Sequence, residues 1–182
     1  MRQRRKRGPW PPMVSLLLLI GLTACSEDDG PKDLRLLTPQ TTVHTLLDAY
    51  GVLEVPQAEI DRRMELGRRF HLNDPDARRL VFADWDEPAD EGLAGYVFGN
   101  LVRTKDDLRI TITEDVAHVR PGNPELRLRP VVLREDGPGW RIVLEESVPP
   151  AVATDLRRAF EERGRAGGSE GAPTALPRVP EL

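Results

Sequence analysis

Cysteine is nearly absent from this chain, because Cys25 is the only one among 182 residues. A single thiol cannot close an intramolecular disulfide, so any folded part must be held together by packing alone. The three histidines, His44, His71 and His118, share no short spacing and have no cysteine to complete a ligand set. The sequence therefore predicts no metal site and no other cofactor.

Aromatic residues are also scarce, with three Trp, four Phe and two Tyr. The core must rest on aliphatic side chains, and few rings are free to stack on bases or sugars. Basic residues are few outside the first segment: five of the 26 Lys and Arg lie in residues 2–7, which leaves 21 against 30 Asp and Glu. A chain that acidic lacks the concentrated basic surface that phosphates require, so we expect no nucleic-acid partner.

A long hydrophobic run is missing as well. The longest one covers residues 13–22 and reads MVSLLLLIGL. This is about half of the roughly 20 residues that a membrane-spanning helix needs. Basic residues precede the run and the small residues Thr23 and Ala24 follow it. This order is the layout of a cleaved signal peptide rather than of a permanent anchor.

The residues Leu22, Thr23, Ala24 and Cys25 resemble the lipobox of bacterial lipoproteins. The resemblance implies that a diacylglyceryl group joins the thiol of Cys25 and that a peptidase cuts between Ala24 and Cys25. Two or three acyl chains hold a protein on a membrane, because each buried methylene contributes about 0.8 kcal/mol. Ser26 is similar to the residue that directs such proteins to the outer membrane, which implies anchoring at its periplasmic face. A general secretory signal with an unmodified Cys25 is the alternative.

Composition divides the chain into four parts. We expect a signal peptide over residues 1–24, a flexible tether over 25–37, one α+β domain over 38–163 and a disordered tail over 164–182. The tether opens with acidic residues, glycine and proline, and the tail is rich in glycine and proline. Both compositions are typical of solvated segments that bury little.

Helical periodicity fills the first half of the domain, and each helix starts at a proline signal. Thr38 is predicted to cap the first helix, and Pro39 to take its first position. The predicted helices cover about 39–50, 56–70, 75–85 and 88–102, and a last one covers 150–163.

After Thr104 the apolar period changes from 3.6 to 2, which indicates strands. They are expected over 108–113, 116–120, 125–135 and 140–146. Tight turns between them predict an antiparallel meander. Helices first and strands second indicate the α+β class, with N-terminal helices packed on a curved antiparallel sheet and an extra C-terminal helix.

The segments TPQTTVHTLLDAYG, RITITEDVAHVRPG and LRLRPVVLREDGPGWRIVL resemble parts of the nuclear-transport-factor-2-like superfamily, over about residues 38–144. Its small cone-shaped domains place helices against a curved sheet, and the resemblance implies a pocket between the two. Tyr50, Trp85 and Tyr96 would line that pocket, although their helical spacing also suits plain core packing. No catalytic residue of the superfamily matches a position in this chain.

Motifs for catalysis are missing too. The sequence has no GxSxG, no GxxxxGK[ST] and no GxGxxG after a strand. The acidic cluster at 84–91 lacks the ligand order of a calcium loop and is interpreted as a solvated connection between helices. We therefore expect a lipid-anchored, non-catalytic module that binds an envelope protein or a small ligand. The alternative is an isomerase or cyclase that uses the pocket between helices and sheet.

Overall fold

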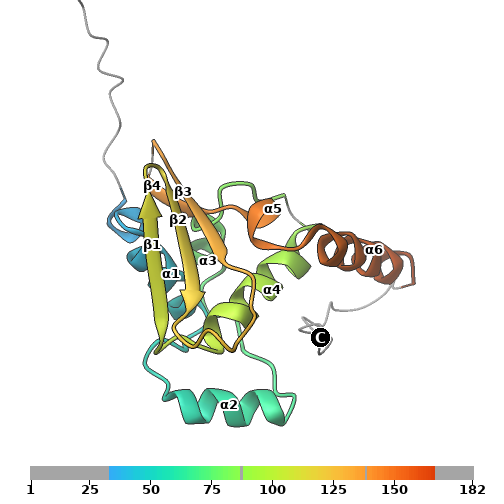
Figure 1. The fold of residues 1–182 in the computed structure, drawn as a ribbon. Coiled ribbons are helices and arrows are strands. Elements are labelled where there is room, and N and C mark those ends of the chain that lie inside the picture. The colour runs from blue at the N-terminus through green and yellow to red at the C-terminus, as the bar shows by residue number, and fades with distance from the viewer. Residues whose placement is uncertain (1–32, 87, 138, 167–182) are drawn as a thin grey trace, which may run out of the picture.

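The computed structural model describes residues 33–86, 88–137 and 139–166 (Figure 1). The expected signal peptide, its lipobox, Cys25 and residues 167–182 of the expected tail lie outside them. The helices are η1 (Leu34–Leu36), α1 (Pro39–Ala49), α2 (Gln57–Glu65), α3 (Pro75–Leu80), α4 (Glu91–Val102), α5 (Leu144–Ser147) and α6 (Pro150–Ala166). In this part of the chain no helix combines the length and the apolar character needed to cross a membrane.

One antiparallel sheet follows α4. Its strands are β1 (Leu108–Thr113), β2 (Val116–Pro121), β3 (Val131–Asp136) and β4 (Gly139–Ile142). They lie in the order β1-β2-β3-β4, so the sheet is open and each strand pairs with its neighbour in sequence. Figure 1 shows α1 and α4 behind this sheet and α6 to its side. The predicted α+β class, with helices on an antiparallel sheet and a C-terminal helix, is confirmed.

The register of the sheet defines an inner face. Ile110 lies opposite Val119, and Leu133 lies opposite both Ala117 and Ile142. Side chains alternate between the two faces of a strand, so these residues all point the same way. Burial of Val119, Leu133 and Ile142 shows that this face meets the helices.

Helix α1 forms as its sequence predicts. The Thr38 hydroxyl accepts from the N–H of Thr41, and the Thr41 hydroxyl accepts from the N–H of Thr38. This reciprocal cap and Pro39 at the first position set the start of the helix. One turn later the Thr42 hydroxyl donates to the carbonyl oxygen of Trp140 at 2.7 Å, which ties α1 to β4.

Phe98 of α4 fills the centre of the core. Its side chain is fully buried and stacks on Tyr50 with ring centroids 3.8 Å apart. Phe70 packs edge-on against the Phe98 ring, with the ring centroids 5.5 Å apart. Burying a side chain of this size contributes roughly 1.5 to 3 kcal/mol. Aromatic packing therefore fills the space between the end of α1, α4 and the segment after α2.

The fold begins before the predicted boundary at residue 38. Leu34–Leu36 form η1, and Leu36 is fully buried. A Cβ on Gly139 would collide with the backbone of Leu36, and Gly139 has a φ of +127° that favours glycine. The expectation of a tether through residue 37 is thus wrong for 33–37, because the buried Leu36 packs this segment onto β4.

Helices α2 and α3 are shorter than predicted. They end at Glu65 and Leu80, well before Phe70 and Trp85. Gly67 has a φ of +63°, which turns the chain away from the axis of α2. Phe70 is nevertheless buried, and Trp85 stacks on Phe82 with centroids 5.4 Å apart. Both rings therefore pack inward, as helical periodicity predicted, but they lie in the connections after α2 and α3 and not on the helices.

Strand β3 is also shorter than predicted, since it starts at Val131 rather than Glu125. Pro130 has no N–H to offer a neighbouring strand. Just before it, the N–H of Leu128 donates to the carbonyl oxygen of Leu126 at 2.7 Å, so the segment bonds to itself.

The last predicted strand ends at Ile142, and the chain then turns into α5 instead of continuing to Glu146. The start of this helix is held by Asp84, whose Oδ1 accepts from the N–H of Leu144 at 2.9 Å. At the other end of the domain, α6 runs to Ala166, three residues into the expected tail.

Candidate functional site

Two of the predicted pocket residues, Tyr50 and Trp85, meet around Arg78 of α3. The Arg78 guanidinium carbon lies 4.9 Å from the centre of the Trp85 ring, and Nη1 lies 3.5 Å from the Tyr50 hydroxyl. Nη1 and Nη2 donate to the two carboxylate oxygens of Glu91 at 2.8 and 2.6 Å. Arg78 is only 5% exposed, so this bidentate pair joins α3 to α4 inside the protein.

Tyr50, Arg78, Trp85 and Glu91, which we call the Arg78 cluster, are largely buried, although the Glu91 side chain remains 33% exposed. Burial raises the pKa of the Tyr50 hydroxyl, which therefore stays protonated to a higher pH than usual. The Nε of Arg78 and the indole N–H of Trp85 are buried without partners in the described part of the chain. Arg78 could not be recognised from the sequence, since an arginine on a short helix looks like any solvated residue until its partner on another helix is known.

Tyr96 does not join this cluster. It is half-buried on α4 and packs against the core. Tyr50 and Trp85 thus meet at Arg78, and the stacking of Tyr50 on Phe98 agrees with the alternative of plain core packing.

Several carboxylates of the acidic cluster at 84–91 have partners within the fold, so the segment is not simply a solvated connection. Asp84 caps α5, and Glu91 binds Arg78. Asp90 is 3% exposed and accepts from Arg157 of α6 at 3.1 Å. Over residues 33–86, 88–137 and 139–166, no group of three or more His, Cys, Asp and Glu side chains is placed to hold a metal ion.

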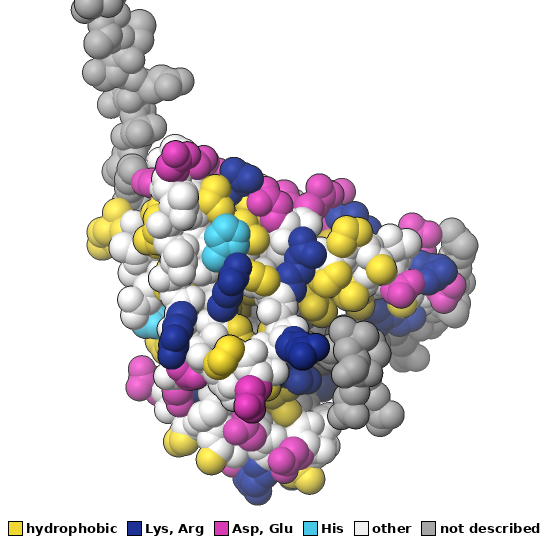
Figure 2. Space-filling view, viewed as in Figure 1, with side chains coloured by type: hydrophobic (Ala, Val, Ile, Leu, Met, Phe, Trp, Pro, Cys, Tyr) yellow, Lys and Arg dark blue, Asp and Glu magenta, His cyan; other side chains and the backbone are white. Residues whose placement is uncertain are grey.

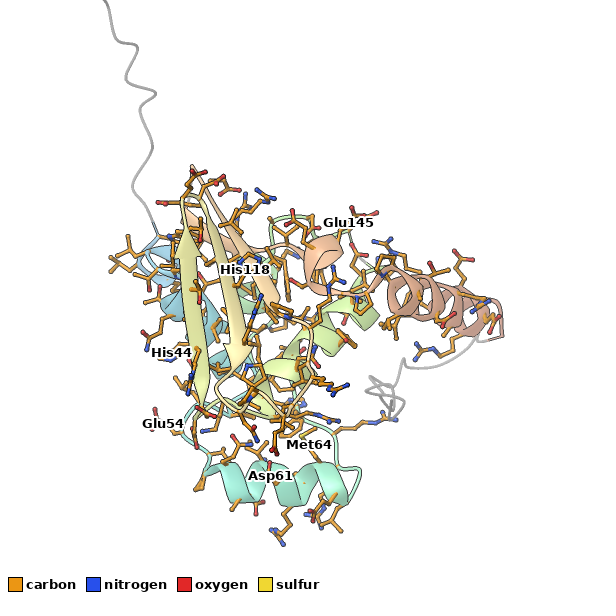
Figure 3. All side chains as sticks on the ribbon, in the orientation of Figure 1. His44, Glu54, Asp61, Met64, His118 and Glu145 are labelled. Atoms are coloured by element: carbon orange, nitrogen blue, oxygen red, sulfur yellow. The ribbon has the colours of Figure 1, made fainter. Side chains whose placement is uncertain are left out.

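The outer face of the sheet is open and carries positive charge. Arg109 of β1 lies directly opposite Arg120 of β2, and His118 is two residues from Arg120 on the same face. We call these three residues the basic face. Figure 2 shows basic side chains gathered over the sheet, and Figure 3 places His118 at its centre. Both arginines are exposed, and among the described residues neither has an acidic partner.

Two neighbouring arginines on the same side of the sheet do have acidic partners. Arg134 donates to the carboxylate of Glu146 at 2.8 Å, and Arg141 forms an ion pair with Asp136. The positive charges of Arg134 and Arg141 are therefore neutralised by carboxylates of the same chain. The arginines of the basic face instead face solvent.

A small pocket lies where the end of α4 meets β1, β2 and the segment before β3. Its cavity volume is only about 10 Å³, which is room for at most about one water molecule. Its apolar walls come from Leu101, Leu108, Val119, Leu128 and Val131.

Asn100 and Thr104 supply the polar atoms of this pocket. The amide Nδ2 of Asn100 and the hydroxyl of Thr104 are buried, and neither has a hydrogen-bond partner in the described ranges. Neither residue was predicted from the sequence. Their only sequence signal is polarity near the end of an otherwise apolar helix.

Comparison with known proteins gave no further guide, because no family model, no curated protein and no solved structure matches this chain.

Proposed function

We propose that this protein is exported, is held to a membrane by lipid on Cys25 and acts there as a non-catalytic binding module. The pattern of Leu22, Thr23, Ala24 and Cys25 supports the anchor, and Ser26 supports the periplasmic face of the outer membrane. The described fold begins at Asp33, eight residues after Cys25. A stretch of that length reaches at most about 28 Å, so the domain would stay close to the membrane.

The filled interior is the observation that favours a binding module over an isomerase or cyclase. Such an enzyme needs a cavity with an acid or base facing it. Here Tyr50 stacks on Phe98, and Glu91 and Asp90 are paired with arginines. The side chains here whose chemistry could serve as an acid or a base are thus paired with other side chains and hold helices together.

The basic face is the surface that such a module would offer. Like charges directly opposite each other on two strands destabilise a sheet, so Arg109 and Arg120 are retained at some cost in stability. An acidic partner would remove that cost, and charge complementarity of this kind guides association. The proposed partner is therefore an acidic segment of an envelope protein.

The anchor is tested by expressing the full chain with Cys25→Ser, with Ser26→Ala as the control for a change near the cleavage site. The wild type should give a mature protein whose N-terminal mass includes acyl groups and which sediments with outer membranes. Cys25→Ser should leave uncleaved or soluble protein, whereas Ser26→Ala should still carry lipid. A membrane-bound wild type with an unmodified Cys25 would rule the proposal out.

The basic face is tested separately with a fluorescent decaglutamate peptide and the full chain in detergent. Binding should weaken at least tenfold in the double variant Arg109→Glu/Arg120→Glu. The control Arg68→Glu/Arg69→Glu makes the same charge change in the exposed segment after α2 and should bind as the wild type does. Equal loss in both double variants would show a response to net charge alone and would contradict a specific face.

A further inference from the structure

The two edges of the sheet differ in whether they are covered. At β4, the N–H of Ile142 donates to the carbonyl oxygen of Val81 at 2.7 Å, and the N–H of Ala83 donates to the carbonyl oxygen of Ile142 at 2.9 Å. The segment that follows α3 therefore covers the edge at β4. At the other side of the sheet, β1 pairs with β2 alone, and Figure 1 shows β1 as the outermost strand.

The register shows which backbone groups of β1 face this free edge. One position before β1, the carbonyl oxygen of Asp107 accepts from the N–H of Gly122 at 2.6 Å. Backbone bonds between two antiparallel strands involve every second residue, so Arg109, Thr111 and Thr113 also bond to β2. The N–H and C=O groups of the residues between them point to the free edge. These residues, which we call the edge residues, are Leu108, Ile110 and Ile112.

The edge residues have no backbone partner on that side within the described ranges. A row of unpaired N–H and C=O groups is a template for a further strand, and proteins usually block it with proline, a β-bulge or an inward-pointing charge. None of these devices is present in β1, which reads LRITIT and keeps a continuous register with β2. Its only charged residue, Arg109, lies on the outer face. The edge of β1 is therefore open to pairing.

The side chains on the two faces of β1 select the sequence of an added strand. On the outer face Arg109 lies opposite Arg120, so a neighbouring acidic residue is favoured. On the inner face Ile112 is 53% exposed and Ile110 is half-buried, so a neighbouring apolar residue is favoured. Side chains of a strand alternate between its faces, so a peptide with alternating acidic and apolar residues meets both requirements. A second copy of β1 and β2 would instead add two more arginines to the outer face.

We propose that an acidic segment of a partner protein binds by adding a strand to the free edge of β1. Its backbone pairs with the edge residues, and its acidic side chains lie beside Arg109 on the outer face. Its apolar side chains cover Ile110 and Ile112 on the inner face. This inference rests on the acidic partner of the proposed function and states how that partner is held. It does not depend on the lipid on Cys25.

The test uses the full chain in detergent and the fluorescent octapeptide Thr-Glu-Val-Glu-Val-Glu-Val-Thr. Two further forms carry N-methyl groups, one on every valine and the other on every glutamate. Successive N–H groups of a strand point in opposite directions, so only one of these forms loses the N–H groups that face β1. That form should bind at least tenfold more weakly, and the other should bind as the unmethylated peptide does. Loss with the methylated valines indicates an antiparallel strand, and loss with the methylated glutamates a parallel one.

These peptides also separate the inference from the proposed function. Equal affinities of the two methylated forms would overturn strand addition. If Arg109→Glu/Arg120→Glu still weakened the binding of decaglutamate in that case, the basic face would stand as an acidic-peptide site. If decaglutamate binding did not respond either, the basic face would fail as well.

A pair of variants tests the same edge from the side of the protein. The N–H of Ile112 points away from β2, so Ile112→Pro removes a donor of the free edge and keeps the bonds between β1 and β2. It should bind the octapeptide at least tenfold more weakly than the control Ile112→Ala, which loses most of the same side chain and keeps the N–H. Melting temperatures check that both variants fold, and equal affinities in two folded variants would contradict pairing at the edge.

The wild type with the methylated peptides decides the matter if Ile112→Pro does not fold. Sedimentation of the wild type tests the competing occupant. A dimer that the octapeptide does not dissociate would assign the edge of β1 to a second copy of the chain and overturn the proposal.

Discussion

The polar side chains at the two ends of α4 differ in whether they have bonding partners. At its N-terminal end, Glu91 binds Arg78 and Asp90 binds Arg157, so each carboxylate has a charged partner on another helix. At its C-terminal end, Asn100 and Thr104 are buried, and their Nδ2 and Oγ1 atoms have no partner in the described ranges. One helix therefore carries an end whose polar side chains hold other helices and an end whose buried polar atoms do not.

The difference has a physical consequence for mutations. Removing one partner of a buried pair leaves the other charge without compensation, and the protein loses stability. Removing a polar group that has no partner leaves nothing uncompensated, and an apolar side chain of the same shape can even stabilise. A substitution should therefore change the free energy of unfolding by a different amount, and with a different sign, at the two ends of α4.

The largest effect is expected for Arg78→Met, which isolates the Glu91 carboxylate and removes the contact with Trp85. Breaking a fully buried pair costs about 3 to 5 kcal/mol, and because the Glu91 side chain is one-third exposed the expected loss is about 1.5 to 3 kcal/mol. Chemical unfolding gives the value, and Arg62→Met serves as the control because its pair with Glu59 is exposed and should matter little. Similar values for the two variants would mean that Arg78 is not important for the fold.

A smaller effect is expected for Tyr50→Phe, and it should depend on pH. The folded protein holds the Tyr50 pKa above its ordinary value near 10, whereas the unfolded chain loses this proton at about pH 10. Stability therefore falls as the pH rises above 10, because the unfolded state then binds fewer protons. Urea unfolding between pH 8 and 11.5 should show a shallower fall in Tyr50→Phe. Equal slopes would contradict the burial of this hydroxyl.

The basic face should show a gain in stability, although a small one. Arg109→Glu places opposite charges on the facing positions of β1 and β2, and such a pair contributes roughly 0.2 to 1 kcal/mol. Arg120→Glu should give the same gain, and the double variant should lose it because two glutamates repel as two arginines do. The four free energies of unfolding form a closed cycle. Additive gains in the double variant would show that the two side chains do not interact.

Local chemistry explains what could be predicted from the sequence. The cap at Thr38 and Pro39 needs only neighbouring residues, and α1 forms as predicted. The antiparallel meander was predicted in the same way from tight turns between short strands, and the sheet has the order β1-β2-β3-β4. Such features are set by residues a few positions apart, so a single sequence contains them.

The remaining features depend on partners that are distant in the sequence. Asp84 caps α5 from 60 residues away, and no local pattern could show that the strand stops at Ile142. The pocket around Asn100 is closed by Leu128 and Val131, which approach it only after the sheet has formed. The polar groups of the site could therefore be seen in the sequence, but their lack of partners could not.

The free energy of unfolding of Asn100→Leu, measured beside Arg78→Met under the same conditions, tests the contrast between the ends of α4 most directly. The amide of Asn100 has no partner to lose, so the variant should match the wild type within about 0.5 kcal/mol or exceed it. A loss of more than about 1.5 kcal/mol, which is the size expected when a hydrogen-bonded buried group is removed, would show that this amide supports the fold and would contradict the account.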